Sequence, residues 1–250
     1  MRLGVVSYLN ALPLWKPLEQ LTRVEIVREV PSRLQQLLQS REVEAALLPV
    51  VDWIRHGGHA ISDAGICADG PVRSVLIFSH KEPREWRTLG ADTSSHTSVA
   101  LSQVLARDLW HTAPVIVAHA PDFTVMRARF DAWLLIGDAA LEARAHCPPD
   151  VRIFDLAQCW RDLTGLPFVF ATWVAREDLS VCEREDLGDL LSLARDKGEL
   201  QISLLAREAS SPLPSEEIES YLREAIGYRV TARHRMAMEE FRARCAALQT

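Results

Sequence analysis

The first fourteen residues place strong limits on how this chain can fold. An apolar run of strand length, Leu3 to Val6, is followed at once by small and polar residues, among them Tyr8 and Asn10. Pro13 fits the first turn of a helix but not its interior. The stretch therefore predicts a buried strand, a tight turn and a helix start. Because ligands of open α/β sheets bind at the carboxyl ends of strands, we expect Tyr8 and Asn10 at a ligand site.

The rest of the chain alternates strand-length apolar segments with amphipathic segments of helical period. The strand-like segments are residues 24–30, 43–51, 60–67, 75–78, 115–118, 132–136, 151–156 and 168–175. Helical patterns separate several of these segments and fill the chain from residue 183 onward. This order predicts an α/β protein whose sheets are mostly parallel.

The same order predicts two α/β lobes joined by two crossings of the chain, with a ligand cleft between the lobes. We expect the first lobe to hold residues 1–88 and 173–250, and the second, inserted lobe to hold residues 89–172. Residues 79–86 are polar and contain a proline, so we interpret them as the approach to the first crossing. Residues 164–167, with a glycine and then a proline, have the composition of a hinge before the second crossing.

Charge and hydropathy restrict the classes of partner. The 250 residues include 28 basic and 34 acidic side chains, which gives a net charge of −6 without any basic run. Nucleic acid is therefore not expected as a partner. No apolar run is long enough to span a bilayer, and the N-terminus has no signal-peptide pattern, so we expect a cytoplasmic protein without membrane contact.

Cysteine and histidine spacing gives no metal or disulfide signal. The five cysteines are odd in number and scattered without a CxxC pair, and the eight histidines show no HxxxH or HExxH spacing. A disulfide framework and a metal site are therefore not expected. The GxSxG, GxGxxG and P-loop patterns are also absent, which leaves hydrolase and nucleotide-binding interpretations without support.

Asn10 is the first candidate for a catalytic residue. Its neutral side chain offers one carbonyl acceptor and two amide donors, which suits the orientation of a polar ligand. Asparagine is also a favoured N-cap residue, so the side chain could simply cap the following helix. Both interpretations stay open, and they are compatible because a side chain at a helix start can face a cleft.

A second candidate cluster is the polar segment of residues 93–98, which directly precedes an amphipathic helical run. The first N–H groups of a helix and its positive dipole end bind carboxylates and phosphates. Ser95, Thr97 and Ser98 are therefore candidate ligand-binding residues, with ordinary helix capping as the alternative. His96 is the histidine best placed to act as an acid or base.

Four further candidates lie next to predicted strands. Ser74 precedes a strongly apolar strand, and the Gly137-Asp138 pair separates another strand from a predicted helix. A hydroxyl or carboxyl group there could face the cleft, although Asp138 could equally be an N-cap. Arg73 could bind a carboxylate in bidentate fashion, but an exposed surface arginine is the more common case.

Five short blocks follow one another between residues 4 and 176: SYLNALPL at 7–14, GPVRSV at 70–75, HTSVAL at 96–101, LLIGDAAL at 134–141 and TGLPFVFATW at 164–173. In this order they resemble the sequence pattern of the chorismate dehydratase family of the futalosine route to menaquinone. Each block alone is a weak signal, whereas five in order are specific. Beyond residue 176 only the helical pattern is similar.

The resemblance implies a type 2 periplasmic-binding-protein-like α/β fold with two lobes and a ligand cleft between them. It also implies a hydro-lyase that eliminates water from chorismate, a small dicarboxylate, without metal or organic cofactor. Asn10 is the catalytic residue that the resemblance implies. The substrate-binding residues carried over with it are Tyr8, Ser74, Ser95, Thr97, Ser98, Gly137 and Asp138.

Two other functions remain open from the sequence. One is a non-catalytic cytoplasmic protein that binds small carboxylates, because a fold does not fix a function. The other is the sister lyase acting on cyclic dehypoxanthinyl futalosine, although the Ser7-Tyr8-Leu9-Asn10 block is more similar to the dehydratase. A homodimer built on the C-terminal helices is also open.

Overall fold

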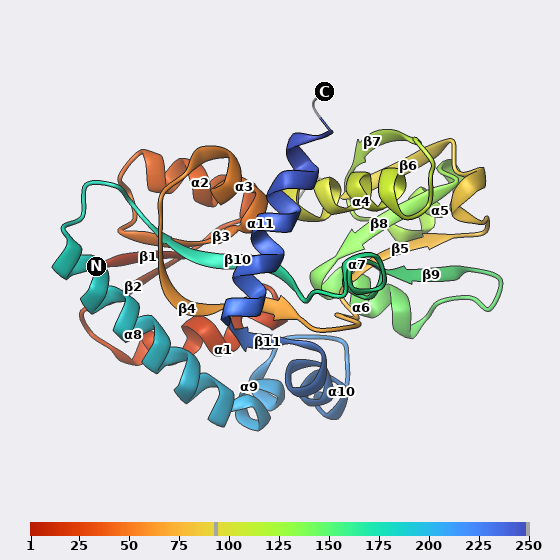
Figure 1. The fold of residues 1–250 in the computed structure, drawn as a ribbon. Helices are drawn as coiled ribbons and strands as arrows, with labels where there is room; N and C mark the ends of the chain where they lie inside the picture. The colour runs from red at the N-terminus through yellow and green to blue at the C-terminus, as the bar shows by residue number, and fades with distance from the viewer. Residues whose placement is uncertain (93–94, 249–250) are drawn as a thin grey trace.

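The computed structural model describes residues 1–92 and 95–248 of the chain. Its strands form two separate sheets, one on each side of the molecule (Figure 1). Two lobes with α/β structure were predicted, and this fold class is confirmed. Residues 93 and 94 of the predicted polar segment lie outside the described residues.

The first sheet has six strands in the order β11-β4-β10-β3-β1-β2. Their bounds are β1 (Arg2–Val5), β2 (Glu25–Arg28), β3 (Ala45–Pro49), β4 (His59–Ala68), β10 (Phe168–Ala175) and β11 (Gly227–Arg229). Strand β3 is buried along its whole length, as expected for a continuous apolar run with helices on both faces. The edge strand β2 is only half-buried, which agrees with its alternating sequence.

The second sheet has five strands in the order β7-β6-β8-β5-β9. Their bounds are β5 (Val75–Ser79), β6 (Thr88–Asp92), β7 (Val115–His119), β8 (Ala132–Ile136) and β9 (Arg152–Asp155). Strands β5 and β8 are buried throughout because both faces of this sheet are covered. On one face Ile77 and Leu134 join the main hydrophobic core, while Phe78 and Trp133 form a smaller cluster on the other.

The prediction of mostly parallel sheets is wrong. Strand β1 pairs in parallel with β2 and β3, and β6 with β7 and β8, but β10 is antiparallel to both β3 and β4. Strand β5 is likewise antiparallel to β8 and β9. The two strands at the lobe crossings are thus inserted between strands that run the other way. Apolar periodicity carries no information on which strand becomes a neighbour or in which direction it runs.

The division between the sheets also differs from the predicted lobe boundaries at residues 88 and 173. Strand β5 already belongs to the second sheet, so the first crossing lies between Ala68 and Val75. Strand β10 belongs to the first sheet from Phe168 onward. Residues 79–86, predicted as the approach to a crossing, instead connect β5 with β6 inside the second lobe.

Helices cover both faces of the two sheets and form the C-terminal part of the chain (Figure 1). The α-helices are α1 (Leu12–Trp15), α2 (Pro31–Gln39), α3 (Val50–His56), α4 (His96–Asp108), α5 (Phe123–Arg129), α6 (Gly137–Ala145), α7 (Leu156–Thr164), α8 (Val181–Leu200), α9 (Ile202–Glu208), α10 (Ser215–Ser220) and α11 (Ala232–Ala246). Shorter 3₁₀ segments are η1 (Leu9–Ala11), η2 (Lys16–Gln20) and η3 (Pro83–Glu85), and η4 (Tyr221–Ala225) is a π-helix. Within the described residues, none of these helices has the length and apolar character needed to span a membrane.

The two crossings run next to each other, and helix α11 lies across the junction of the lobes (Figure 1). Ala68 at the end of β4 pairs with Phe168 at the start of β10. Near the start of α11, Arg233 bonds both the Asp69 carboxylate in the first crossing and the Gly165 carbonyl in the second. Helix α11 therefore ties the two connecting segments to each other.

Helix α8 supports the segment that carries Asn10. Gly198 packs directly on α1, where a Cβ atom at this position would lie 1.9 Å from the Pro13 carbonyl oxygen. Only glycine at position 198 therefore allows α8 to approach α1 this closely. Since Pro13 follows Asn10 by three residues, this contact also fixes the turn at the start of the chain.

We predict that Gly198→Ala lowers the free energy of unfolding by about 1–3 kcal/mol, because the added methyl group overpacks the α8–α1 contact. Helix propensity alone gives the opposite sign, since alanine is favoured over glycine in a helix by roughly 0.8–1 kcal/mol. Urea denaturation measures the difference. Leu193→Ala on the exposed face of α8 is the control, with an expected change within about 0.5 kcal/mol. A stabilised Gly198→Ala variant would contradict the packing argument.

Candidate active site

A small cavity lies between the two lobes, and most of the predicted site residues line it. Its volume is about 60 Å³. Six of the eight residues predicted from the sequence contribute to its wall: Tyr8, Asn10, Ser95, Thr97, Ser98 and Gly137. The remaining wall is apolar, made of Val6, Pro31, Leu47, Pro49, Ile66, Val75, Ile136, Phe170 and Ala171. None of the described lining residues carries a charge.

Asn10 forms the first-lobe side of the cavity. Strand β1 ends at Val5, and the 3₁₀ turn η1 then holds Asn10 in its centre with only 9% of its surface exposed. Tyr8, not Asn10, occupies the N-cap position of η1, so the capping interpretation of Asn10 is wrong. The Asn10 Oδ1 atom is buried and has no hydrogen-bond partner among the described residues. An orphaned acceptor of this kind is costly in a fold and is typical of a functional site.

The opposite side of the cavity is the N-terminus of α4. Ser95 is the N-cap: its Oγ accepts from the Ser98 N–H at 3.2 Å and donates to Ser98 Oγ at 2.8 Å. Thr97 Oγ1 accepts from the Val51 N–H of α3 at 3.2 Å. Because a hydroxyl group has one proton, the protons of Thr97 and Ser98 remain for a ligand, whereas that of Ser95 is already used. The site therefore presents donors that suit a carboxylate.

Gly137 and Asp138 join the lobes beside the cavity. Gly137 has φ +58°, and a Cβ atom there would lie 2.9 Å from the Tyr8 ring, so only glycine allows this ring to pack on the start of α6. Asp138 is not an N-cap of its own helix, which begins at Gly137 with Ile136 as its N-cap. Its carboxylate instead accepts from the Leu9 N–H of the other lobe at 3.1 Å. Burial raises the pKa of Asp138, and the Leu9 N–H only partly offsets this effect.

Ser74 and Arg73 do not line the cavity. Ser74 is fully buried, and its Oγ accepts a hydrogen bond of 2.7 Å from the Tyr221 hydroxyl. Direct contact between Ser74 and a substrate stays a prediction. The Arg73 guanidinium bonds Ser220 and Glu224 on the outside of the molecule, in agreement with the surface interpretation.

Two residues escaped the sequence reasoning: Tyr221, the partner of Ser74, and Phe170 in the cavity wall. Tyr221 lies 211 positions from Asn10 in the chain, in a region where only the helical pattern had been recognised. Phe170 lines the cavity from the interior of β10, where it looked like one more core residue. No local spacing in the sequence distinguishes either of them, because their positions depend on contacts between segments far apart in the chain.

His96 takes part in a contact between the lobes rather than in the cavity wall. Its Nδ1 atom lies 2.9 and 3.1 Å from the two carboxylate oxygens of Asp52 in α3, and Asp52 is almost completely buried. The pair stands beside the Thr97–Val51 hydrogen bond, so α3 and α4 are held at two adjacent points. The arrangement positions the α4 N-terminus against the first lobe.

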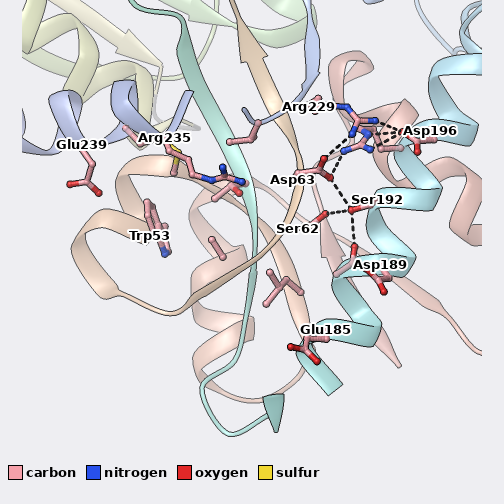
Figure 2. A pocket seen from close by; sticks show the side chains of 17 residues that line it. Trp53, Ser62, Asp63, Glu185, Asp189, Ser192, Asp196, Arg229, Arg235 and Glu239 are labelled. Carbon is pink, nitrogen blue, oxygen red and sulfur yellow. Dashed lines mark hydrogen bonds and ion pairs between the residues drawn. The ribbon is translucent and has the colours of Figure 1, made fainter. Parts of the chain in front are cut away.

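A much larger groove, of about 980 Å³, lies between β4, α8 and α11, outside the cleft between the lobes (Figure 2). Its polar groups bond one another: Asp63 accepts from Ser192, Arg195 and Arg229, and both arginines also bond Asp196. Burial opposes ionisation of Asp63, but these donors outweigh it and lower its pKa. Arg195 is 1% exposed, so the network holds α8 against the first sheet. Size alone therefore does not identify the site.

The arrangement defines a class of protein: a two-lobed, periplasmic-binding-protein-like α/β fold with a ligand cavity between the lobes. Solved structures have the same fold. A protein from Archaeoglobus fulgidus is similar with a TM-score of 0.73 and 15% identity, covering 99% of this chain and 97% of that chain. The periplasmic aliphatic sulphonate binding protein from Escherichia coli is similar with a TM-score of 0.64 and 17% identity, covering 100% and 87%.

The family follows from the sequence match over the whole chain. A family model described as menaquinone biosynthesis matches residues 1–247, and the chain belongs to that family. The chain is 28% identical over 256 residues to the chorismate dehydratase of Campylobacter jejuni, covering 99% of both chains. It is 29% identical over 218 residues to the chorismate dehydratase of Thermus thermophilus, covering 77% of this chain and 79% of that protein.

Asp138 gives a pH-dependent prediction for stability. Its pKa is raised in the folded state, so the folded chain binds its proton more tightly, and its contribution to stability falls as the pH rises above about 4. Asp138→Asn keeps an acceptor for the Leu9 N–H without the charge. We predict that the free energy of unfolding of this variant, relative to the unsubstituted chain, increases between pH 4 and pH 7.

Urea denaturation across that pH range measures the difference, and Asp189→Asn on the exposed side of α8 is the control. A relative stability of Asp138→Asn that decreases with rising pH would show that the carboxylate is favoured in the fold.

Proposed function

We propose that this chain eliminates water from chorismate to give 3-[(1-carboxyvinyl)oxy]benzoate, as a hydro-lyase of futalosine-dependent menaquinone biosynthesis. The two relatives named chorismate dehydratase and the family match support this assignment. The main structural support is a single cavity that has a hydrogen-bond acceptor on one wall and hydrogen-bond donors on the opposite wall. Asn10 offers an unpartnered acceptor on one side, and Thr97 and Ser98 offer hydroxyl donors at a helix N-terminus on the other.

The reaction needs little from the protein beyond geometry and charge placement. The ring hydrogen at the carbon that bears the enolpyruvyl ether is removed, and the neighbouring hydroxyl group leaves. The resulting ring is aromatic, which provides a large driving force. Alignment of the reacting groups and stabilisation of developing charge are then the main contributions of the site.

The residues of the cavity fit these two tasks. Thr97 and Ser98, together with the positive end of the α4 dipole, bind the ring carboxylate and stabilise the dienolate that forms when the proton leaves. Asn10 Oδ1 accepts a hydrogen bond from the ring hydroxyl and orients the reacting carbons. Tyr8 and Gly137 shape the cavity, and Ser95 caps the helix that holds the donors. The base in this proposal is the enolpyruvyl carboxylate of the substrate itself.

No cofactor is required by this mechanism. Among the residues that the structure describes, no three His, Cys, Asp or Glu side chains come together as a metal site. The enolpyruvyl carboxylate of the substrate takes up the ring proton and passes it to the departing hydroxyl, which leaves as water.

The cavity is small for the substrate. A volume of about 60 Å³ holds only a few water molecules, whereas chorismate is a substituted ring with two carboxylates. We expect the lobes to separate when the substrate enters; on one side the described contacts between them are the Asp52–His96 pair and the Thr97–Val51 bond. A cytoplasmic location and a homodimer remain predictions.

Turnover of chorismate tests the function directly. The purified chain is incubated with chorismate and a chelator, and the products are followed by liquid chromatography and mass spectrometry. Loss of one water with formation of the aromatic enol ether is the expected result. Binding of chorismate without any product would instead identify a carboxylate-binding protein, and neither binding nor turnover would favour the sister lyase.

Asn10→Ala is predicted to lower kcat by about 100-fold or more, because the acceptor that orients the leaving hydroxyl is lost. Gln35→Ala is a matched control. Gln35 is also 9% exposed and also has a buried amide oxygen without a partner among the described residues, but it lies on α2 outside the cavity. Kinetics with chorismate compare the two variants. Full activity of Asn10→Ala, or an equal loss in Gln35→Ala, would contradict the role of Asn10.

A further inference from the structure

Phe170 occupies an irregular position in strand β10, directly beside the cavity. In the pairing of β10 with β4, Val169 and Ala171 lie opposite two consecutive residues, Cys67 and Ile66. Phe170 is therefore the extra residue of a β-bulge. A bulge bends its strand and redirects a side chain, and bulges are over-represented next to active sites.

Solvent reaches Phe170 although the strand around it is buried. The other residues of β10 are all buried, and β10 is an interior strand of its sheet. Among the residues that line the cavity, Phe170 and Tyr8 are partly exposed, whereas all the others are buried. The bulge thus places an aromatic ring in the cavity wall with part of its apolar surface free to contact a ligand.

A buried aromatic cluster holds the ring of Phe170 in place. The ring centroids of Phe168 and Phe170 lie 4.8 Å apart, with the rings inclined by 66°. Phe168 also contacts Trp160 at 5.4 Å and Phe241 at 5.0 Å, and these three side chains are at most 1% exposed. Trp160 Nε1 donates to the Pro167 carbonyl at 3.0 Å, which anchors the cluster at the second crossing. A ring held in this way loses little freedom when a ligand binds.

The chemistry of the cavity wall determines what Phe170 can recognise. The hydroxyl donors of Thr97 and Ser98 suit a carboxylate, and no described residue of the wall is charged. The remainder of a carboxylate ligand therefore meets apolar groups, among them the Phe170 ring. A flat π-system packs on such a ring in edge-on or offset arrangements that a saturated, puckered ring does not reproduce.

We propose that Phe170 is a specificity-determining residue of the site: its ring contacts the ring of the ligand and selects flat, unsaturated carboxylates over saturated ones. The inference rests on the proposed dehydratase function for the identity of the substrate, a cyclic diene whose product is aromatic. Because the ring becomes flat during the elimination, this contact strengthens towards the transition state. The selection for ring shape itself is measurable without turnover.

Benzoate and cyclohexanecarboxylate are matched probes, because both carry one carboxylate on a six-membered ring and they differ in flatness and π electrons. Isothermal titration calorimetry of the unsubstituted chain should show about 3- to 10-fold tighter binding of benzoate. Phe170→Leu keeps an apolar side chain without a π-system and should reduce this ratio to within about 2-fold. Phe170→Tyr keeps the aromatic ring and should retain the ratio.

Phe154→Leu is the matched control. Phe154 is also a partly exposed phenylalanine of a strand and makes an edge contact with Trp86, with ring centroids 5.3 Å apart, but it lies outside the cavity. This variant should keep the preference for benzoate. Equal binding of the two probes to the unsubstituted chain, no binding of benzoate, or a preference that survives in Phe170→Leu would overturn the proposal. An equal loss of preference in Phe154→Leu would also overturn it.

A second measurement needs no substitution and decides the question if Phe170→Leu does not fold. In the unsubstituted chain with isotope-labelled phenylalanine rings, the protons of bound benzoate should show nuclear Overhauser contacts to the Phe170 ring. Absence of these contacts would contradict the proposal.

The two proposals can fail separately. If the unsubstituted chain does not turn over chorismate but prefers benzoate through Phe170, only the dehydratase assignment fails. For an active chain we expect Phe170→Leu to lower kcat/KM with chorismate by about 3- to 10-fold. If turnover is normal and Phe170→Leu retains both kcat/KM and the preference for benzoate, only the role of Phe170 fails.

Discussion

The buried hydrogen bond between the Tyr221 hydroxyl and Ser74 Oγ ties the C-terminal region of the chain to the junction of the lobes. It joins the first crossing between the lobes to the π-helical turn near the C-terminus. A buried polar group without a partner costs roughly 1–3 kcal/mol, so each of these two side chains restricts where the other can lie. The contact therefore fixes the π-helical turn against the first crossing between the lobes.

The electrostatics of the cavity depend on neutral polar groups. The chain has a net charge of −6, and no described residue of the cavity wall is charged, yet the proposed substrate carries two carboxylates. Hydroxyl donors at the α4 N-terminus provide positive potential without a lysine or arginine. Charged side chains are instead paired with one another in the groove along α8, where Arg195 and Asp63 serve stability. Neutral hydroxyl groups are thus available for ligand binding, whereas pairs of charged side chains stabilise the fold.

Much of the fold could be predicted from local patterns. The apolar segments that became β3, β5, β8 and β10 are buried in the structure, and the turn after β1 places Asn10 at a cavity, because burial and turn chemistry are encoded locally. The insertion of β10 between β3 and β4 could not be predicted, and neither could the position of the first crossing before β5. Both depend on which strands become neighbours, and this is decided by packing between segments far apart in the sequence.

The same distinction applies to the site. Residues in short polar segments at strand ends were recognised, whereas Tyr221 was not, because its contact with Ser74 spans 147 residues of the chain. Ser74 was recognised for a different reason than the one the structure gives, since it bonds Tyr221 and lies off the cavity wall.

A crystal structure with 3-[(1-carboxyvinyl)oxy]benzoate bound tests the central claim most directly. We predict that the ligand lies between the lobes, with its ring carboxylate at the Thr97 and Ser98 hydroxyls and its ether-bearing edge next to Asn10. The lobes should then stand further apart than in the ligand-free protein. A ligand bound instead in the groove between α8 and α11, or one that leaves the Asn10 amide without contact, would contradict this account.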